Sequence, residues 1–215
     1  MLSSLLVKLS TQRGDTSEEL ADKRLRKGLA SEMFQRKGSE LAERWEALYE
    51  AAGPRAPQPT ILEGDARELP RLLGKDGPRF DLVLSSPPYG GTYDYVTHHA
   101  RRYAWLGLDP SALEKGEIGA RRHYVAGAAG MRRFDDELRV VLNAIAAVCA
   151  PDANVLLLVG DAELSGARVD AAEQVGKLGA RAGLSLVASV SQPRHDFRGG
   201  PERREHLVLL KPKRR

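Results

Sequence analysis

The stretch Asp81 to Tyr95, DLVLSSPPYGGTYDY, holds the residues whose types and spacing best suit chemistry. An apolar run with strand character ends there in Ser86, Pro87, Pro88 and Tyr89. Proline has no backbone N–H and holds the residue before it extended, so two successive prolines end a strand and fix the direction of the following carbonyls. We expect these carbonyls and the Ser86 hydroxyl to be free hydrogen-bond acceptors beside the flat Tyr89 ring.

Two convergent acceptors beside an aromatic ring suit an exocyclic amino group on a planar base. Such an amine is a weak nucleophile because its lone pair is delocalised into the ring. Accepting hydrogen bonds from both N–H groups would localise that lone pair and aim it at an electrophilic methyl group, by positioning and electrostatics without a strong base. A base in a duplex would have to be flipped out to reach such a pocket. The alternative interpretation is a proline-terminated strand followed by an ordinary turn.

The elements that must position this motif follow Thr60, where short apolar runs alternate with helical stretches. Alternation at this spacing is typical of a parallel α/β sheet, in which ligands bind at the carboxyl ends of the strands. The last two strands are joined by a loop without a helix, which predicts an antiparallel pair. The predicted strands are 60–66, 80–86, 154–161, 184–192 and 205–212, and the predicted helices are 134–150 and 169–182.

The amino-terminal part has a different pattern. From Asp15 to Ala52 apolar residues recur at helical spacing, with an N-cap predicted at 15–17 and with Gly28 and Gly38 expected to weaken or divide the helix. Three prolines within 54–59 indicate a stiff linker. We therefore predict a helical segment at 1–53, a proline-rich linker at 54–59 and an α/β domain at 60–215.

The run DLVLSSPPY resembles motif IV of the amino-methyltransferases that modify the N4 of cytosine or the N6 of adenine in DNA. The family pattern is an acidic residue, Asn or Ser, then Pro-Pro, then an aromatic residue, and Ser86, Pro87, Pro88 and Tyr89 fill it without a gap. The resemblance implies a Rossmann-like class I methyltransferase sheet, S-adenosyl-L-methionine as cofactor, DNA as partner, and a place in restriction-modification. Serine in first place favours N4-cytosine. Ser86 and the Pro87 carbonyl would then hold the amine, and Tyr89 would stack on the base.

The resemblance extends over about Thr60 to Pro212, although only the SPPY segment is specific. TILEGDAREL looks like the family's strand that ends near the cofactor's adenine, which makes Asp65 an expected cofactor contact, together with Ser85. RREHLVLLKP looks like the closing strand.

Five further residues are expected to contact the substrate. Tyr93 and Tyr95 would extend the stacking wall, with half-buried packing as the alternative. Arg121 lies in an irregular segment, EIGARRHY, whose counterparts in the family sit near the substrate. Arg198 and Arg203 crowd the final hairpin loop and would meet phosphates. Surface charge is the alternative for all three arginines.

The glycine-rich cofactor motif of this family, aromatic-x-Gly-x-Gly after a strand, does not occur in this sequence. In the family the strand order is 3-2-1-4-5-7-6, and the first two strands are not found between 60–66 and 80–86. The sheet would have a hole about 10 Å wide at ordinary strand spacing. We therefore expect either a non-family arrangement or a second polypeptide that supplies the cofactor half. The opening LSSLLVK resembles the middle of a larger protein, as after a gene split or at a late start codon.

The remaining features bound the class of protein. Cys149 is the only cysteine and has apolar neighbours, so we expect a buried thiol and no internal disulfide. The five histidines show neither ligand spacing nor an acidic partner, so no metal site is expected. Asp161 is expected to cap a helix or to line the crevice. No apolar run is long enough to span a membrane, and a cytoplasmic setting is expected. The net charge of +4 permits a polyanionic partner.

Two other functions remain open from the sequence. An RNA or protein amide methyltransferase would use a similar Pro-Pro-aromatic exit from a strand. A non-catalytic remnant that binds nucleic acid would retain the motif without turnover.

Overall fold

The computed structural model describes residues 2–11, 13, 19–124, 128–164, 167–194 and 202–213. The chain divides into two compact units, one formed by 1–61 with 96–114 and the other by 62–95 with 115–215. The second unit contains the SPPY motif and all the strands of the main sheet. None of the helices in the described ranges is long and apolar enough to cross a membrane.

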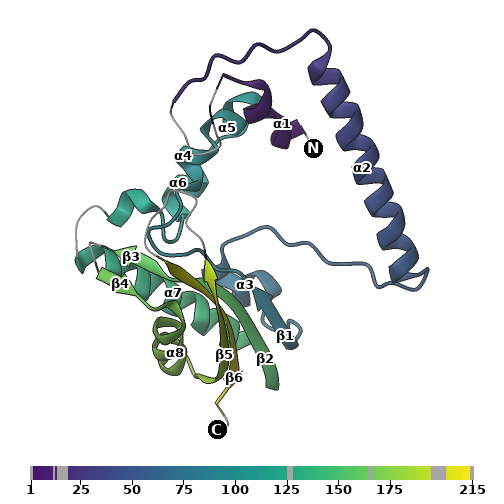
Figure 1. The fold of residues 1–215 in the computed structure, drawn as a ribbon. Helices are drawn as coiled ribbons and strands as arrows, with labels where there is room; N and C mark the ends of the chain where they lie inside the picture. Colours follow the sequence, from purple (N-terminus) through teal and green to yellow (C-terminus); the bar gives the residue numbers. More distant parts are fainter. Residues whose placement is uncertain are drawn as a thin grey trace. The chain divides into compact units, whose positions relative to one another are not determined.

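The second unit is built on a four-stranded mixed sheet with the order β1-β2-β6-β5 (Figure 1). β1 pairs with β2 in parallel, whereas β6 is antiparallel to both of its neighbours, so β1, β2 and β5 run in one direction. The predicted antiparallel final pair is confirmed, and the parallel pairing expected of the earlier strands is found between β1 and β2. The strands are β1 (Phe80–Ser85), β2 (Cys149–Gly160), β5 (Leu184–Arg194) and β6 (Arg203–Pro212).

The protein is therefore α/β, and its strand order corresponds to positions 4-5-7-6 of the expected Rossmann-like sheet. The expected strand at 60–66 does not form: residues 60–65 have no helix or strand, and a 3-10 helix, η1 (Ala66–Glu68), follows. Ile61 is 89% exposed and Leu62 is 53% exposed. A strand is stabilised by pairing with neighbours, and this apolar run is not paired in either of the sheets that the described residues form.

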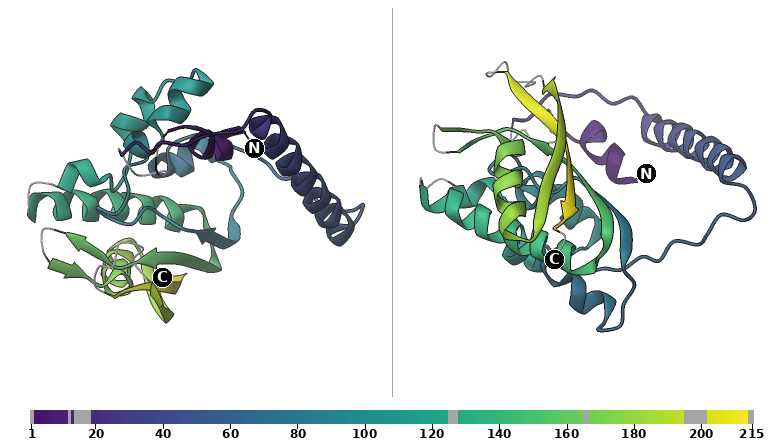
Figure 2. Two further views of the ribbon diagram at one scale, coloured as in Figure 1. Left: turned by 45° about the horizontal axis from the view of Figure 1, so that its top comes forward. Right: turned by 90° about the horizontal axis from the view of Figure 1, so that it is seen from below.

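Helices α7 (Ala128–Val148) and α8 (Ala171–Arg181) cover one face of the sheet (Figure 2). The core consists of the helices' apolar side chains and alternate residues of the strands beneath them. Leu142 of α7, Val155 and Leu157 of β2, and Val208 and Leu210 of β6 are all at most 1% exposed. The period of two in the strands sets this division, because successive side chains point to opposite faces.

The opposite face of the sheet is apolar and open to solvent. Register places Leu84 beside Leu156, and Leu207 beside both Leu158 and Val190, on this face. Leu84 is 72% exposed and Val190 is 70% exposed. Exposed apolar surface of this extent is typical of a sheet face that another element covers.

The remaining elements of the second unit are short. Helix α3 (Leu69–Leu73) and η1 pack on α7, and β3 (Ala162–Leu164) pairs with β4 (Ala167–Val169) in a small second sheet. The 3-10 helix η2 (Arg121–Tyr124) precedes α7. Cys149 is buried as expected, and burial raises the pKa of its thiol.

The first unit is helical, and its long helix differs from the prediction. α2 (Leu29–Ala52) begins after Gly28, which has a left-handed φ of 83°, and continues through Gly38 without a break. The N-cap predicted at 15–17 lies outside the described residues. Helices α1 (Leu2–Leu9) and α5 (Ala100–Leu106) contact each other in this unit. Helices α4 (Tyr95–His98) and α6 (Ser111–Gly116) each span the boundary between the units.

Because one face of the sheet is buried and the other is exposed, we predict unequal losses in the free energy of unfolding for two similar substitutions. Leu157→Ala leaves a cavity under α7 and should lower the free energy of unfolding by about 2–5 kcal/mol. Leu84→Ala, in an exposed position, should change it by less than about 0.5 kcal/mol. Urea unfolding followed by circular dichroism measures both. Equal losses in the two variants would show that the open face is packed as tightly as the core.

Candidate substrate site

The candidate site lies at the edge of the main sheet where β1, β2 and β5 end, across the strand direction and distinct from the outer strand β1. Because β1, β2 and β5 run in one direction and β6 runs against them, the ends of the first three strands meet the start of the fourth. This edge carries the SPPY motif after β1, Asp161 after β2, Arg194 at the end of β5 and Arg203 at the start of β6. It is the edge where open α/β sheets bind ligands.

Tyr89 is held at this edge by residues of the neighbouring strands. Its hydroxyl donates a hydrogen bond to Oε1 of Glu205 at 3.0 Å, and its ring contacts Gly160, the last residue of β2. A Cβ at position 160 would lie 2.7 Å from the Tyr89 ring, so only glycine allows this approach. The guanidinium of Arg194 lies over the ring, 5.3 Å from its centroid. The ring is therefore half-buried in a fixed orientation.

The groups before Tyr89 remain available as acceptors. Ser86 is exposed, Pro87 is half-buried, and within the described ranges no backbone donor contacts the Pro87 carbonyl. Burial raises the pKa of Tyr89. A hydrogen bond with the Ser86 hydroxyl lowers this pKa, and the hydrogen bond with Glu205 raises it further. Tyr89 therefore stays a neutral hydrogen-bond donor at physiological pH.

The segment after Tyr89 is tied to residues almost thirty positions later. The N–H of Gly91 donates to the carbonyl of Gly119 at 3.0 Å, and the N–H of Arg121 donates to the carbonyl of Tyr93 at 2.9 Å. A Cβ at Gly90 would lie 3.0 Å from the Phe134 ring, so helix α7 packs directly on this turn. The irregular segment is thus fixed against the exit of β1.

A buried ion network reinforces the same junction. The Arg122 guanidinium contacts Asp94 at 2.6 Å and Glu117 at 2.7 Å, and both carboxylates are buried. The other oxygen of Glu117 accepts the backbone N–H of Tyr95 at 2.7 Å. Glu117 and Arg122, which lie in the same EIGARRHY segment as Arg121, are therefore partners in a buried ion pair. Two carboxylates that share one guanidinium and a backbone donor hold this loop in one conformation.

Tyr93 and Tyr95, expected to extend the stacking wall, stack on each other. Their ring centroids are 5.6 Å apart with an interplanar angle of 16°, and the two residues are 48% and 40% exposed. Arg121 is exposed, and its backbone is bonded to Tyr93 as described above.

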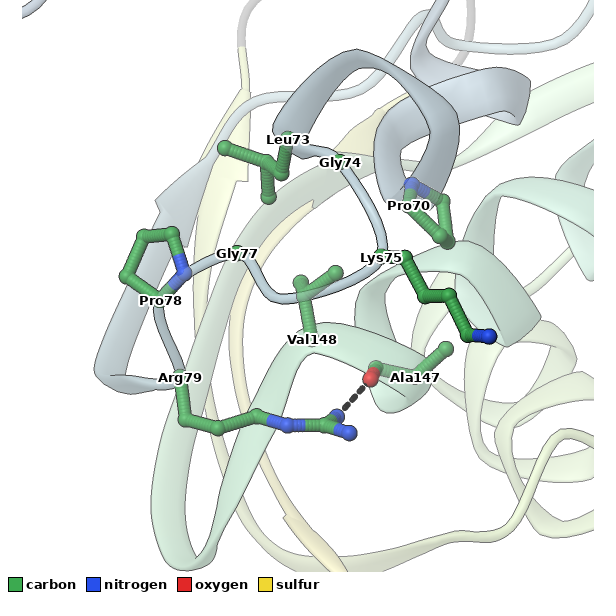
Figure 3. A pocket seen from close by; sticks show the side chains of 9 residues that line it. All are labelled: Pro70, Leu73, Gly74, Lys75, Gly77, Pro78, Arg79, Ala147 and Val148. Carbon is green, nitrogen blue, oxygen red and sulfur yellow. Dashed lines mark hydrogen bonds between the residues drawn. The ribbon is translucent and has the colours of Figure 1, made fainter.

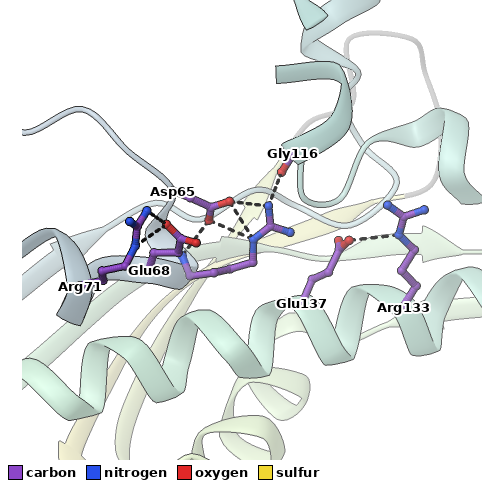
Figure 4. Close-up of polar contacts among 7 residues, drawn as sticks. Asp65, Glu68, Arg71, Gly116, Arg133 and Glu137 are labelled. Carbon is purple, nitrogen blue, oxygen red and sulfur yellow. Dashed lines mark hydrogen bonds and ion pairs between the residues drawn. The ribbon is translucent and has the colours of Figure 1, made fainter. Parts of the chain in front are cut away.

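Asp65, the expected cofactor contact, is engaged by Arg67 (Figure 4). Its carboxylate caps η1 by accepting the N–H of Arg67 at 2.8 Å and pairs with the guanidinium of the same residue. Arg67 also donates to the carbonyl of Gly116 at 3.1 Å. Hydrogen bonding to Arg67 outweighs burial and holds the pKa of Asp65 below its ordinary value.

Asp161 forms a buried polar network with His206, which lies close to it through the pairing of β2 with β6. Oδ1 of Asp161 lies 2.9 Å from Nε2 of His206, and Nδ1 of His206 lies 2.8 Å from Oγ of Ser191. Oδ1 also accepts the N–H of Ala171, the first residue of α8, at 3.2 Å. The expectation that no histidine has an acidic partner is therefore wrong, because strand register joins residues 45 positions apart.

The ligand atoms of Asp161, Asp170 and His206 lie within 4.8 Å of one another, but hydrogen bonds already use them. Asp170 is the N-cap of α8 and accepts the N–H of Glu173 at 2.9 Å. Burial alone would raise the pKa of Asp161, but the bonds that it accepts outweigh burial and lower it. The three residues connect β2, β6 and the start of α8.

The basic residues of the final hairpin are described in part. Arg194 and Arg203 are paired across β5 and β6, and Arg204 is exposed. Arg198 lies outside the described residues. A shallow hollow lined by Pro70, Arg79 and Val148 lies at the opposite, amino-terminal end of β1 (Figure 3). It is thus separate from the SPPY edge.

Sequence reasoning missed the residues that orient Tyr89. Glu205 and Gly160 carry no local signal, since both act through strand register. Asp94 lies within the quoted stretch, but its burial depends on Arg122. The apolar run that precedes SPPY is the only sequence signal that places the site.

No protein-family model and no curated protein matches this chain. A candidate DNA modification methylase of Thermus thermophilus, solved with S-adenosyl-L-methionine, is similar to it with 17% identity and a TM-score of 0.41, over 71% of this chain and 52% of that one. LepI in complex with the same cofactor has 14% identity and a TM-score of 0.29, over 76% of this chain and 54% of LepI. The chain thus spans about half the length of these structures.

The Asp161 network predicts a pH-dependent stability. Asp161→Asn keeps the shape but removes the charge, and should lower the free energy of unfolding at pH 7 by about 2–3 kcal/mol. A carboxyl whose folded pKa is lowered stabilises the fold above its unfolded pKa, and this contribution is lost as pH falls through the folded value. The difference between wild type and variant should therefore narrow below about pH 4.

Denaturant unfolding between about pH 3 and pH 8 measures this difference across the titration of a carboxyl. Asp76→Asn, an exposed carboxyl in the turn before β1, is the matched control and should change the free energy by less than about 0.5 kcal/mol. A difference between wild type and Asp161→Asn that stays constant over the whole range would contradict the role given to the charge.

Proposed function

We propose that this chain is the substrate half of an enzyme that transfers a methyl group from S-adenosyl-L-methionine to the exocyclic amine of a DNA base. N4 of cytosine is preferred over N6 of adenine because Ser86 occupies the first place of the motif. The observation that carries the proposal is the exit of β1 at the ligand-binding edge. There Ser86 and Pro87 directly precede Pro88 and Tyr89, and the Tyr89 ring is half-buried with its hydroxyl bonded to Glu205.

The residues of this edge have separate tasks in the proposed reaction. The flipped base stacks on Tyr89, and its amine donates one hydrogen bond to the Pro87 carbonyl and one to the Ser86 hydroxyl. These bonds hold the nitrogen lone pair out of conjugation and fix its direction, so positioning supplies the rate enhancement. The cofactor supplies an electrophilic methyl group when it is bound. Arg203 lies at the same edge and contacts the DNA backbone.

This chain's own residues do not fit the whole cofactor. The sequence has no aromatic-x-Gly-x-Gly segment, and both oxygens of Asp65 are bonded to Arg67. β1 is at the edge of the sheet, and the apolar side chains of Leu84 and Leu82 beside that edge are exposed. A second polypeptide segment with the glycine-rich loop would pair with β1 and cover this face.

The role of Tyr89 predicts the loss of base-dependent binding in Tyr89→Ala. A base stacked on an aromatic ring contributes about 1–3 kcal/mol, so affinity for a cytosine-containing single strand should fall about 5- to 150-fold. A strand with an abasic residue in place of the cytosine should bind both proteins equally. Fluorescence anisotropy with labelled oligonucleotides measures these affinities.

Tyr49→Ala is the control, because Tyr49 is an exposed tyrosine of α2 in the other unit. It should bind like the wild type. Retained cytosine-dependent binding in Tyr89→Ala would overturn the proposed role. Transfer of labelled methyl groups to DNA, RNA and protein by the chain with its cofactor half separates DNA from the other substrates.

The incomplete cofactor site predicts weak binding of S-adenosyl-L-methionine by the chain alone. Without the glycine-rich loop the cofactor loses the backbone contacts that such loops make. Isothermal titration calorimetry of this chain should show no binding at micromolar concentrations. A micromolar dissociation constant would refute the proposal that a second segment supplies the cofactor half.

A further inference from the structure

Arg194 lies where the proposed function requires a base. It is the last residue of β5, it is half-buried, and its guanidinium carbon lies 5.3 Å from the centroid of the Tyr89 ring. A guanidinium is planar and stacks on aromatic faces much as a nucleobase does. The ring face that Arg194 occupies is therefore already matched to a flat, polar-edged group.

The ring is fixed by groups other than Arg194. The Tyr89 hydroxyl is bonded to Glu205, whose other oxygen lies 3.5 Å from the side-chain nitrogen of Gln192, and the ring contacts Gly160. Arg194, in contrast, has no hydrogen-bond acceptor among the residues that the structure describes. The guanidinium can therefore leave the ring without breaking a hydrogen bond to any of them, while the ring keeps its orientation.

The energies favour an exchange. A cation on a partly exposed aromatic ring is weakly stabilised, whereas a base stacked on an aromatic side chain is stabilised more strongly. A nucleotide also brings a phosphate, to which a guanidinium forms charge-assisted bidentate hydrogen bonds. An arginine displaced from the ring by the base thus finds an acceptor on the same nucleotide.

We propose that Arg194 occupies the stacking place of the target base on Tyr89 in the free protein and exchanges it for a contact with the nucleotide's phosphate. This inference rests on the proposed function, since it assumes that a base stacks on Tyr89. It makes Arg194 a specificity-determining residue that favours nucleotides with a phosphate over free bases. It also explains why a ring meant for substrate is covered in the free protein.

The test compares deoxycytidine with deoxycytidine 5′-monophosphate as probes for the full chain. Ring-current shifts of the base protons in NMR titrations report stacking and give the affinities. In Arg194→Ala the competing guanidinium is gone, so deoxycytidine should bind about 2- to 5-fold more tightly than in the wild type. The preference for the monophosphate over the nucleoside should fall in the same variant, because the phosphate loses Arg194 and keeps only the contact proposed for Arg203.

Arg181→Ala is the control of equal charge change, because Arg181 is an exposed arginine at the end of α8. It should leave both affinities as in the wild type. Unchanged or weaker nucleoside binding in Arg194→Ala overturns the proposal, and so does the absence of ring-current shifts in both proteins. Tyr89→Ala separates the proposed stacking from the proposed exchange. If Tyr89→Ala removes the ring-current shifts while Arg194→Ala leaves both affinities unchanged, only the exchange is wrong. If Tyr89→Ala binds like the wild type, the proposed stacking is wrong as well.

Discussion

The register of β1 against β2 is the constraint on which the rest of the site depends. Ser85, the last residue of β1, pairs with Leu157 near the end of β2. Tyr89, four residues later, therefore lies next to Gly160, the last residue of β2. A slip of one residue would turn every side chain of β1 to the other face and would take the ring away from Glu205. The two prolines stop the pairing of β1 with β2 from continuing past Ser86, because neither proline has a backbone N–H to donate to the other strand.

The buried polar network behind the edge maintains the geometry that the register sets. Asp161 bonds to His206 on β6 and to the first N–H of α8, so three elements meet at one carboxylate. A network whose members are all hydrogen-bonded is stiff, whereas a partly satisfied one costs stability. Glu205, which orients Tyr89, is the neighbour of His206 on β6. The network therefore holds the strand that holds the ring.

The features that depend on local pattern could be predicted from the sequence. The strands expected at 80–86, 154–161, 184–192 and 205–212 are present. They could be predicted because apolar periodicity and turn residues are local properties of the sequence. The expected strand at 60–66 failed because a strand also needs a neighbour. The helix expected from Asp15 begins only at Leu29, and the described residues 19–28 are not helical, since apolar spacing does not fix where a helix begins. The partners Glu205, Gly160 and Arg122 depend on contacts between distant residues, which no single stretch of sequence encodes.

The same contacts determine where the proposed enzyme divides. Glu205 and Gly160, the described residues that orient Tyr89, both lie on the β2 side of β1, in the unit formed by 62–95 and 115–215. A cofactor half would instead meet the free side of β1, where Leu82 and Leu84 are exposed. In the proposed enzyme both halves would share β1: its end would present the acceptors for the amine, and its free edge would receive the strand that carries the cofactor loop. A division of the enzyme at the free edge of β1 would leave the substrate half folded, with the cofactor held by the other half.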